Sequence, residues 1–71
     1  MIALDAVTAA LLQRLDTTAT VYPELTEREA ATRLVLMGLA CSASQHGGAL
    51  LRITEAGRAE ARAQRESRGP V

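Results

Sequence analysis

Few side chains in this 71-residue sequence have the chemistry of an active site. His46 is the single histidine, and Cys41, the single cysteine, precedes it by five positions. A zinc site needs about four ligands in tetrahedral geometry, and this pair has too few suitable neighbours to complete one. A cysteine–histidine nucleophile also needs a third group that orients the histidine. We therefore expect neither a metal site nor a catalytic pair here.

The remaining candidates have simpler structural explanations. Ser42 and Ser44 lie near the histidine, but no G-x-S-x-G sequence surrounds them to expose a nucleophile. The paired carboxylates Glu27 and Glu29 suit the start of a helix, where negative charge is favourable. Gly47-Gly48 lacks the following helix and lysine of a phosphate-binding loop. The sequence predicts that this protein is not an enzyme and binds no cofactor.

The apolar content allows only a small core. Apolar residues make up 48% of the chain, but 14 of these 34 residues are alanine, and phenylalanine and tryptophan are absent. Burying a large aliphatic side chain contributes roughly 1.5–3 kcal/mol, so the fold must bury nearly all of its large aliphatic residues. Small domains of this kind commonly gain further burial from a partner or a second copy. We expect a protein partner, with a homodimer as one alternative.

Charge is balanced overall but unevenly distributed. The chain has eight arginines, no lysine and eight acidic residues, so its formal net charge is zero. Residues 1–51 hold three arginines and five acidic residues, a net −2, whereas residues 52–71 hold five arginines and three acidic residues, a net +2. Nucleic-acid binders usually carry a clear basic excess, because phosphate neutralisation supplies much of their affinity. The balance favours a protein partner over DNA.

The sequence favours a cytoplasmic protein that does not contact a membrane. A single cysteine excludes an internal disulfide and suits a reducing compartment. The longest apolar run, over 34–43, is far shorter than the roughly 18 residues of a membrane span. No basic region precedes the apolar residues at the N-terminus, and Asp5 interrupts their pattern, so a secretory signal is not expected.

The first part of the chain predicts a helix and then an extended segment. Residues 3–15 have Thr8 on the outer side and, at helical spacing on the inner side, Leu4, Val7, Leu11 and Leu15. Residues 16–25 contain threonines and a proline, which disfavour a helix. This segment therefore has room for only a short extended piece at Val21-Tyr22.

A second helix is predicted from a capping box at Thr26 and Glu29 to about Met37. Its predicted inner side holds Ala30, Leu34 and Met37, with Ala31 and Val35 at its flanks. Gly38 fits the left-handed residue that ends a helix, and Leu39 can fold over the last turn.

A hairpin and a third helix are predicted to follow. Strands over 39–43 and 49–53 flank the turn at Gly47-Gly48. The alternation of side chains along a strand predicts that the core-facing residues are Leu39, Cys41, Leu51 and Ile53. Leu50 and Arg52 are predicted to face solvent, and Leu50 is a candidate contact residue. Thr54 caps a helix over 55–66, and 67–71 form a flexible tail. The predicted fold is a single α+β, mainly helical domain over 1–66, with three helices and a two-stranded antiparallel hairpin.

This order of elements resembles the C-terminal half of a winged-helix domain, as found in many bacterial regulators. In that family a helix ends in a Gly-Leu pair, a short hairpin follows, and the second strand runs into an L-T-x-x-G-R step. Here these parts are Gly38-Leu39, the diglycine turn and the segment 53–58, and the likeness covers 33–62. The segment 16–25 departs from the family, because it is too short for the strand and helix expected there.

The resemblance implies a surface that binds a macromolecule. In such regulators the helix before the Gly-Leu pair reads DNA, and the hairpin is a wing that contacts phosphate or the minor groove. The corresponding positions of this sequence are Arg28, Glu29, Thr32, Arg33, Leu36, Gln45, His46 and Arg52. Small modules of this kind also resemble phage or mobile-element proteins that bind and inhibit a larger machine. We therefore expect a protein-binding inhibitor or adaptor, with a DNA-binding transcriptional regulator as the alternative.

Overall fold

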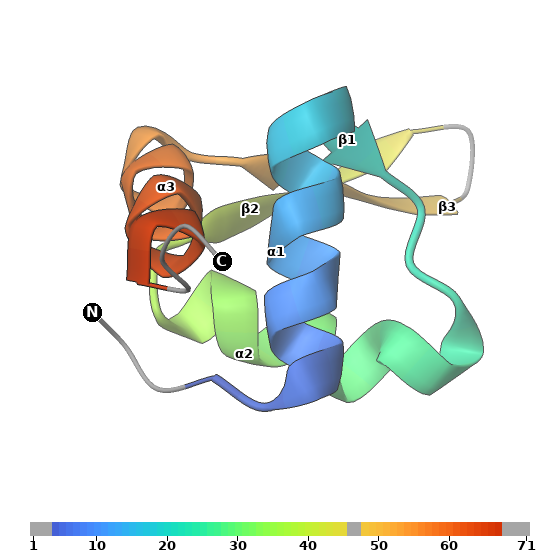
Figure 1. The fold of residues 1–71 in the computed structure, drawn as a ribbon. Coiled ribbons are helices and arrows are strands. Elements are labelled where there is room, and N and C mark those ends of the chain that lie inside the picture. The colour runs from blue at the N-terminus through green and yellow to red at the C-terminus, as the bar shows by residue number, and fades with distance from the viewer. Residues whose placement is uncertain (1–3, 46–47, 68–71) are drawn as a thin grey trace.

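The structure is a computed structural model that describes residues 4–45 and 48–67. These residues form three α-helices and one three-stranded antiparallel sheet (Figure 1). In chain order the elements are α1 (Ala6–Thr18), β1 (Thr20–Val21), the 3-10 turn η1 (Leu25–Glu27), α2 (Arg28–Leu36), β2 (Ala40–Gln45), β3 (Gly48–Ile53) and α3 (Glu55–Ser67). The predicted α+β, mainly helical class is confirmed, and β1 adds a third strand to the expected hairpin.

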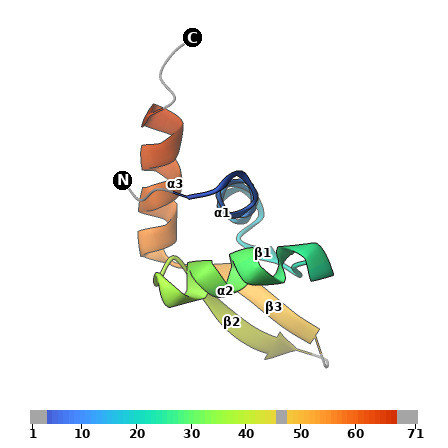
Figure 2. The same ribbon diagram turned by 90° about the horizontal axis from the view of Figure 1, so that it is seen from below.

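The helix α1 is central to the fold. It packs against α2, α3 and β3. Figure 2, in which α1 is seen end on, shows α3 beside it and α2 below it, with the β2–β3 hairpin reaching away beyond α2. The sheet order β1-β3-β2 puts β3 in the middle of the sheet. The core lies where these elements meet and consists of Leu11, Leu12, Leu15, Ala30, Ala31, Leu34, Leu39, Ala40, Leu51, Ile53 and Ala61.

Both ends of α1 lie further along the chain than predicted. The Asp5 carboxylate accepts the Thr8 amide at 2.9 Å and caps the helix at its start. At the other end, the Thr17 and Thr18 hydroxyls donate to the carbonyls four residues earlier, at 3.1 and 2.8 Å. The threonines that were predicted to break the helix therefore lie within its last turn, because their hydroxyls find partners on the helix itself.

The buried side of α1 is also rotated from the predicted one. Val7 is 52% exposed, whereas Thr8, which was predicted on the outer side, is fully buried. Leu12 joins Leu11 and Leu15 in the core. The reason is that α1 contacts α2 on one side and α3 on another, so its buried arc differs from the apolar stripe of the helix alone.

The helix α2 begins at Arg28, and the predicted capping box at Thr26 is wrong. Thr26 is exposed within the 3-10 turn that precedes α2. The Glu27 carboxylate instead accepts the Glu24 amide at 3.0 Å and pairs with Arg14 at 2.8 Å. The helix α2 therefore begins directly after this turn, without a side-chain cap at its N-cap residue Glu27.

The end of α2 is a Schellman motif at Gly38, as the sequence predicts. Gly38 has φ +77°, and its amide donates to the Val35 carbonyl at 3.0 Å. The Leu39 amide donates to the Leu34 carbonyl at 2.9 Å, and Leu39 is buried. Met37 was predicted on the inner side, but it is exposed, since it already lies in the turn that follows α2.

The inward face of β2 differs from the predicted one. Cys41 pairs with Arg52 and is exposed, so its predicted core position is wrong. Ala40 is buried instead, opposite Ile53. The error arises because Leu39 still belongs to the turn after α2, so the alternation of β2 starts one residue later than predicted.

The helix α3 begins after the Thr54 cap, as predicted, with the Gly57 amide donating to the Thr54 hydroxyl at 3.0 Å. Gly57 and Ala61 are the buried residues of this helix. The Gln13 side chain of α1 donates to the Ala61 carbonyl at 2.9 Å. Polar contacts thus join α3 to α1, whereas Gly57 lies against Leu39 and Ile53. The last part of the predicted tail, 68–71, lies outside the described residues.

Candidate functional site

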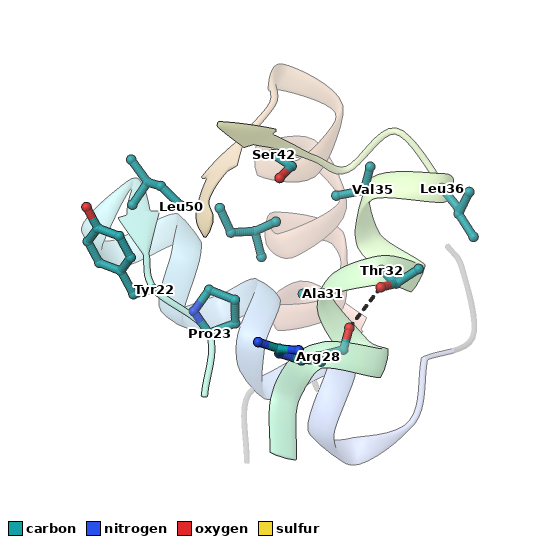
Figure 3. A pocket seen from close by; sticks show the side chains of 10 residues that line it. Tyr22, Pro23, Arg28, Ala31, Thr32, Val35, Leu36, Ser42 and Leu50 are labelled. Carbon is teal, nitrogen blue, oxygen red and sulfur yellow. Dashed lines mark hydrogen bonds between the residues drawn. The ribbon is translucent and has the colours of Figure 1, made fainter. Parts of the chain in front are cut away.

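A groove of about 540 Å³ opens between α2, the hairpin and the segment that follows β1 (Figure 3). Its lining residues are Tyr22, Pro23, Arg28, Ala31, Thr32, Val35, Leu36, Ser42, Leu50 and Leu51. Most of these side chains are apolar, and the volume falls within the range of about 300–1,000 Å³ that is common for ligand sites. The groove is therefore a concave surface with the size and lining of a binding site.

One side of α2 forms a wall of this groove. Positions 28, 32, 35 and 36 are three or four residues apart or adjacent, so they share one side of the helix. The opposite side of α2 is held in the core by Ala30 and Leu34. The Thr32 hydroxyl donates to the Arg28 carbonyl at 3.0 Å, as the dashed line in Figure 3 marks. The groove side of α2 thus combines one charge with an apolar surface at Leu36, which is 80% exposed.

The ion pairs of the structure lie away from the groove. They join Arg33 to Asp5 at 2.7 Å, Arg14 to Glu27 at 2.8 Å, and Arg65 to Asp16. Arg28 makes no ion pair within residues 4–45 and 48–67, and no other charged residue described there lines the groove. The groove therefore presents one uncompensated positive charge beside apolar walls.

Two of the paired carboxylates have lowered pKa values. The backbone amide three residues earlier, followed by Arg14, holds the pKa of Glu27 below its ordinary value. The Thr8 side chain, the Thr8 amide and Arg33 hold the pKa of Asp5 below its ordinary value. Because nearby donor groups and cations favour the charged form, both groups are ionised near neutral pH. They act as structural partners rather than as proton donors.

Four of the nine predicted contact residues line the groove together: Arg28, Thr32, Leu36 and Leu50. Leu50 was predicted to face solvent, but it is only 9% exposed. Val21 of β1 pairs with Leu51, so the chain continues beside Leu50, and Figure 3 shows the Tyr22 ring next to the Leu50 side chain. The third strand, which the predicted two-stranded hairpin lacked, is therefore the reason that Leu50 is covered.

The other five predicted residues lie outside the groove. Glu29 and Arg33 border a shallower hollow on the neighbouring side of α2. Arg52 is exposed and alternates along β3 with core residues, so it lies on the sheet face away from the core. Gln45 ends β2. His46 lies outside the described residues.

Six groove residues were not among the predicted contact residues: Tyr22, Pro23, Ala31, Val35, Ser42 and Leu51. Tyr22 is the single aromatic residue of the chain, it is more than half exposed, and tyrosine is enriched where proteins bind one another. Its type was therefore a usable signal. Ser42 pairs with Leu51 and lines the groove, because the alternation of β2 starts one residue later than predicted.

The described part of the chain holds no group of three histidine, cysteine or acidic side chains placed to bind a metal ion. None of its helices has the length and apolar character that crossing a bilayer requires. No protein family, curated protein or solved structure was found to match this chain. The groove and the charges around it are the features of the described structure that bear on a possible function.

Proposed function

We propose that this protein is a small, non-enzymatic module that acts through contact with another protein, as an inhibitor or adaptor of a larger machine. The groove is the observation that carries this proposal. Tyr22, Val35 and Leu36 expose apolar surface along it, in a chain of zero net charge. Exposed apolar surface around a concave site is typical of protein-binding surfaces. A partner would remove this surface from water and supplement a core with few large side chains.

The charges on α2 support protein binding over DNA binding. Arg33, one of two arginines that the winged-helix resemblance assigns to DNA on this helix, is paired with Asp5. Glu29 lies one turn before Arg33, and its negative charge would repel a DNA phosphate bound at this part of the helix. Tight DNA binding needs several cations that neutralise phosphates, and along this side of α2 only Arg28 lacks a partner among the described residues.

A winged-helix DNA-binding regulator is the alternative. In its favour, β1 and η1 stand where winged-helix proteins have a short strand and a helix, and α2 is followed by a hairpin and a threonine-capped helix. Arg52, Arg58 and Arg62 are exposed and make no ion pair in the part of the chain that the structure describes. These arginines would supply phosphate contacts from β3 and α3.

We further propose that the protein works in the cytoplasm. Cys41 is an exposed thiol on β2. Exposed thiols persist in a reducing compartment and tend to oxidise elsewhere. Mass determination of the protein purified with and without a reductant, after rapid acid quenching of the cells, tests this assignment. A reduced Cys41 at quenching is expected, and a protein isolated as a mixed disulfide would contradict the assignment.

Capture from a cell lysate with two matched variants tests the proposal of protein binding. Leu36 and Leu25 are 80% and 79% exposed, but only Leu36 lines the groove. We expect Leu36→Asp to lose a discrete partner that the wild-type protein captures, and Leu25→Asp to retain it. Equal capture by the two variants would place binding outside the groove, and the absence of any discrete partner would count against the proposal.

A gel-shift titration with duplex DNA separates the two functions. A protein-binding module gives no shift at moderate salt. A DNA-binding regulator gives a shift that weakens steeply as salt rises, because bound counterions are released on binding. The shift of a DNA-binding regulator should also weaken in the Arg28→Ala variant. A salt-sensitive shift with this mutational dependence would replace the proposal by the alternative.

A further inference from the structure

We propose that the partner enters the groove with an apolar segment that carries a carboxylate, and that the Arg28 guanidinium binds this carboxylate. The inference rests on the proposed function and names the chemistry of the partner segment. Arg28 is the charged group of the lining, and Tyr22, Pro23, Val35 and Leu36 supply the apolar walls around it. Such walls fit large aliphatic or aromatic side chains.

The geometry of Arg28 sets it apart from the paired arginines. Arg14 and Arg33 each lie within 2.8 Å of a carboxylate oxygen. Arg28 has no carboxylate partner in the described ranges, although its helix places it at the groove. In Figure 3 its nitrogens point toward Pro23, across the groove from α2. An anion held in the groove would therefore lie within reach of this guanidinium.

A partner that fills the groove must compensate the positive charge of Arg28. The segment would displace water from the guanidinium, and burying an arginine without an anion is costly. A carboxylate offsets this cost, since it accepts two N–H groups of a guanidinium at once. An apolar segment without an acidic residue leaves the charge uncompensated, so the groove selects for the combination of both features.

The carboxylate of a protein segment suits this groove better than a nucleic acid. Phosphates repeat at every nucleotide and need a series of cations along their path. The groove lining supplies a single cation, and its remaining described residues are apolar or carry a hydroxyl. The charge complementarity of the groove is therefore with one anion placed next to apolar side chains.

Selection from a library of random peptides displayed on phage, with the whole chain immobilised, tests this inference. We expect the enriched peptides to combine at least two large apolar residues with one aspartate or glutamate. A synthetic peptide of the enriched sequence should lose affinity at least tenfold when its acidic residue is changed to lysine, and also when the protein carries Arg28→Glu. The lysine peptide should regain affinity on Arg28→Glu, which identifies a direct charge contact.

Arg58→Glu is the matched control, because Arg58 is exposed on α3 and does not line the groove. It should bind the enriched peptide as the wild-type protein does. Circular dichroism checks that the Arg28→Glu and Arg58→Glu variants fold. Arg28→Gln is a second variant at this position that removes the positive charge without reversing it. Affinity that is unchanged in both Arg28 variants would overturn the inference.

Other outcomes separate this inference from the proposed function. Peptides that need Leu36 but carry no acidic residue would overturn the inference and leave protein binding in place. A dimer on a sizing column that Leu36→Asp converts to a monomer would identify a second copy as the occupant and overturn the inference. Failure to enrich any peptide, together with a duplex DNA shift that Arg28→Glu abolishes, would overturn both.

Discussion

The hydroxyl of Thr54 donates a hydrogen bond to the carbonyl of Gly38 at 2.7 Å, which joins the start of α3 to the end of α2. The same hydroxyl accepts the Gly57 amide at 3.0 Å and caps α3. The Thr54 amide donates to the Leu39 carbonyl at 3.2 Å. The Gly-Leu pair and the Thr-x-x-Gly step, which lie apart in the sequence, therefore meet at one place, and this contact sets the position of α3 relative to α2.

Thr54→Val should lower the free energy of unfolding by about 1–2 kcal/mol. The substitution keeps the shape of the side chain but removes both the cap of α3 and the bond to the Gly38 carbonyl. Urea denaturation measures the change. Thr54→Ser is the control and should stay close to the wild type, since it keeps the hydroxyl. An equal loss in the serine variant would show that the methyl group, and not the hydrogen bonds, stabilises the junction.

Gly57→Ala should be more damaging, with a loss of about 3 kcal/mol. An added Cβ would overlap the Leu39 carbonyl oxygen and lie 2.8 Å from Cγ1 of Ile53. The carbonyl belongs to the backbone and already accepts the Thr54 amide, so it cannot move aside without breaking that bond. Thermal and urea denaturation measure the loss.

Gly38→Ala is the matched control for this substitution. Nothing lies within 4 Å of an added Cβ at Gly38, so only its positive φ of +77° opposes alanine. The expected loss is about 1–2 kcal/mol. If Gly57→Ala lowers the free energy of unfolding no more than Gly38→Ala does, the contact between Gly57 and the Leu39 carbonyl has room for a methyl group.

Thr8→Val should raise the free energy of unfolding by about 1 kcal/mol. The Thr8 hydroxyl is fully buried and has no hydrogen-bond partner within the described ranges. Its nearness to the Asp5 carboxylate lowers the pKa of that group, but the geometry falls short of a hydrogen bond. Valine has a similar shape and removes the unsatisfied oxygen.

Urea denaturation of three Thr8 variants checks this expectation. The free energy of unfolding of Thr8→Val should be higher than that of the wild type. That of Thr8→Ala should be lower, because alanine leaves a cavity in the core. Thr8→Ser keeps the hydroxyl and loses only the methyl group, so it should also fall below. A valine variant less stable than the wild type would mean that the hydroxyl bonds to Asp5 after all.

Acid should weaken the fold partly through Glu27. Its pKa is lowered from the ordinary value of 4.5 in the folded protein, so the folded state binds fewer protons than the unfolded state as the pH falls below that value. The contribution of Glu27 to the free energy of unfolding is fully present at pH values above its ordinary pKa. This contribution is lost as the pH falls through the lowered pKa of the folded state. Glu27→Gln should therefore show a flatter decline in acid than the wild type.

Urea unfolding at a series of pH values from about neutral to well below the ordinary carboxyl pKa measures this decline. Glu29→Gln is the control, because Glu29 makes no ion pair among residues that the structure describes. Its curve should lie closer to that of the wild type than the curve of Glu27→Gln does, because Glu29 is without the hydrogen bond and the ion pair of Glu27. Parallel curves for Glu27→Gln and the wild type would show that the contacts of Glu27 do not stabilise the folded state.

Much of the local structure could be predicted from the sequence. The end of α2 at Gly38 and the start of α3 at Thr54 were both found where expected. Each depends on a backbone angle or a hydrogen bond within a few residues, and such short-range requirements are visible in residue type. For the same reason, helical spacing correctly placed Arg28, Thr32 and Leu36 on one side of α2.

Only the tertiary structure decided which side of α1 is buried and what covers the hairpin. Thr8 is in the core because α1 lies between α2 and α3, and no pattern within residues 3–15 contains that information. Leu50 is buried and the groove is closed at Tyr22 because β1 pairs with β3, as the register of Val21 with Leu51 shows. Partners thirty positions apart are chosen by the packing of the whole chain, since two extended residues alone are too short to specify a strand.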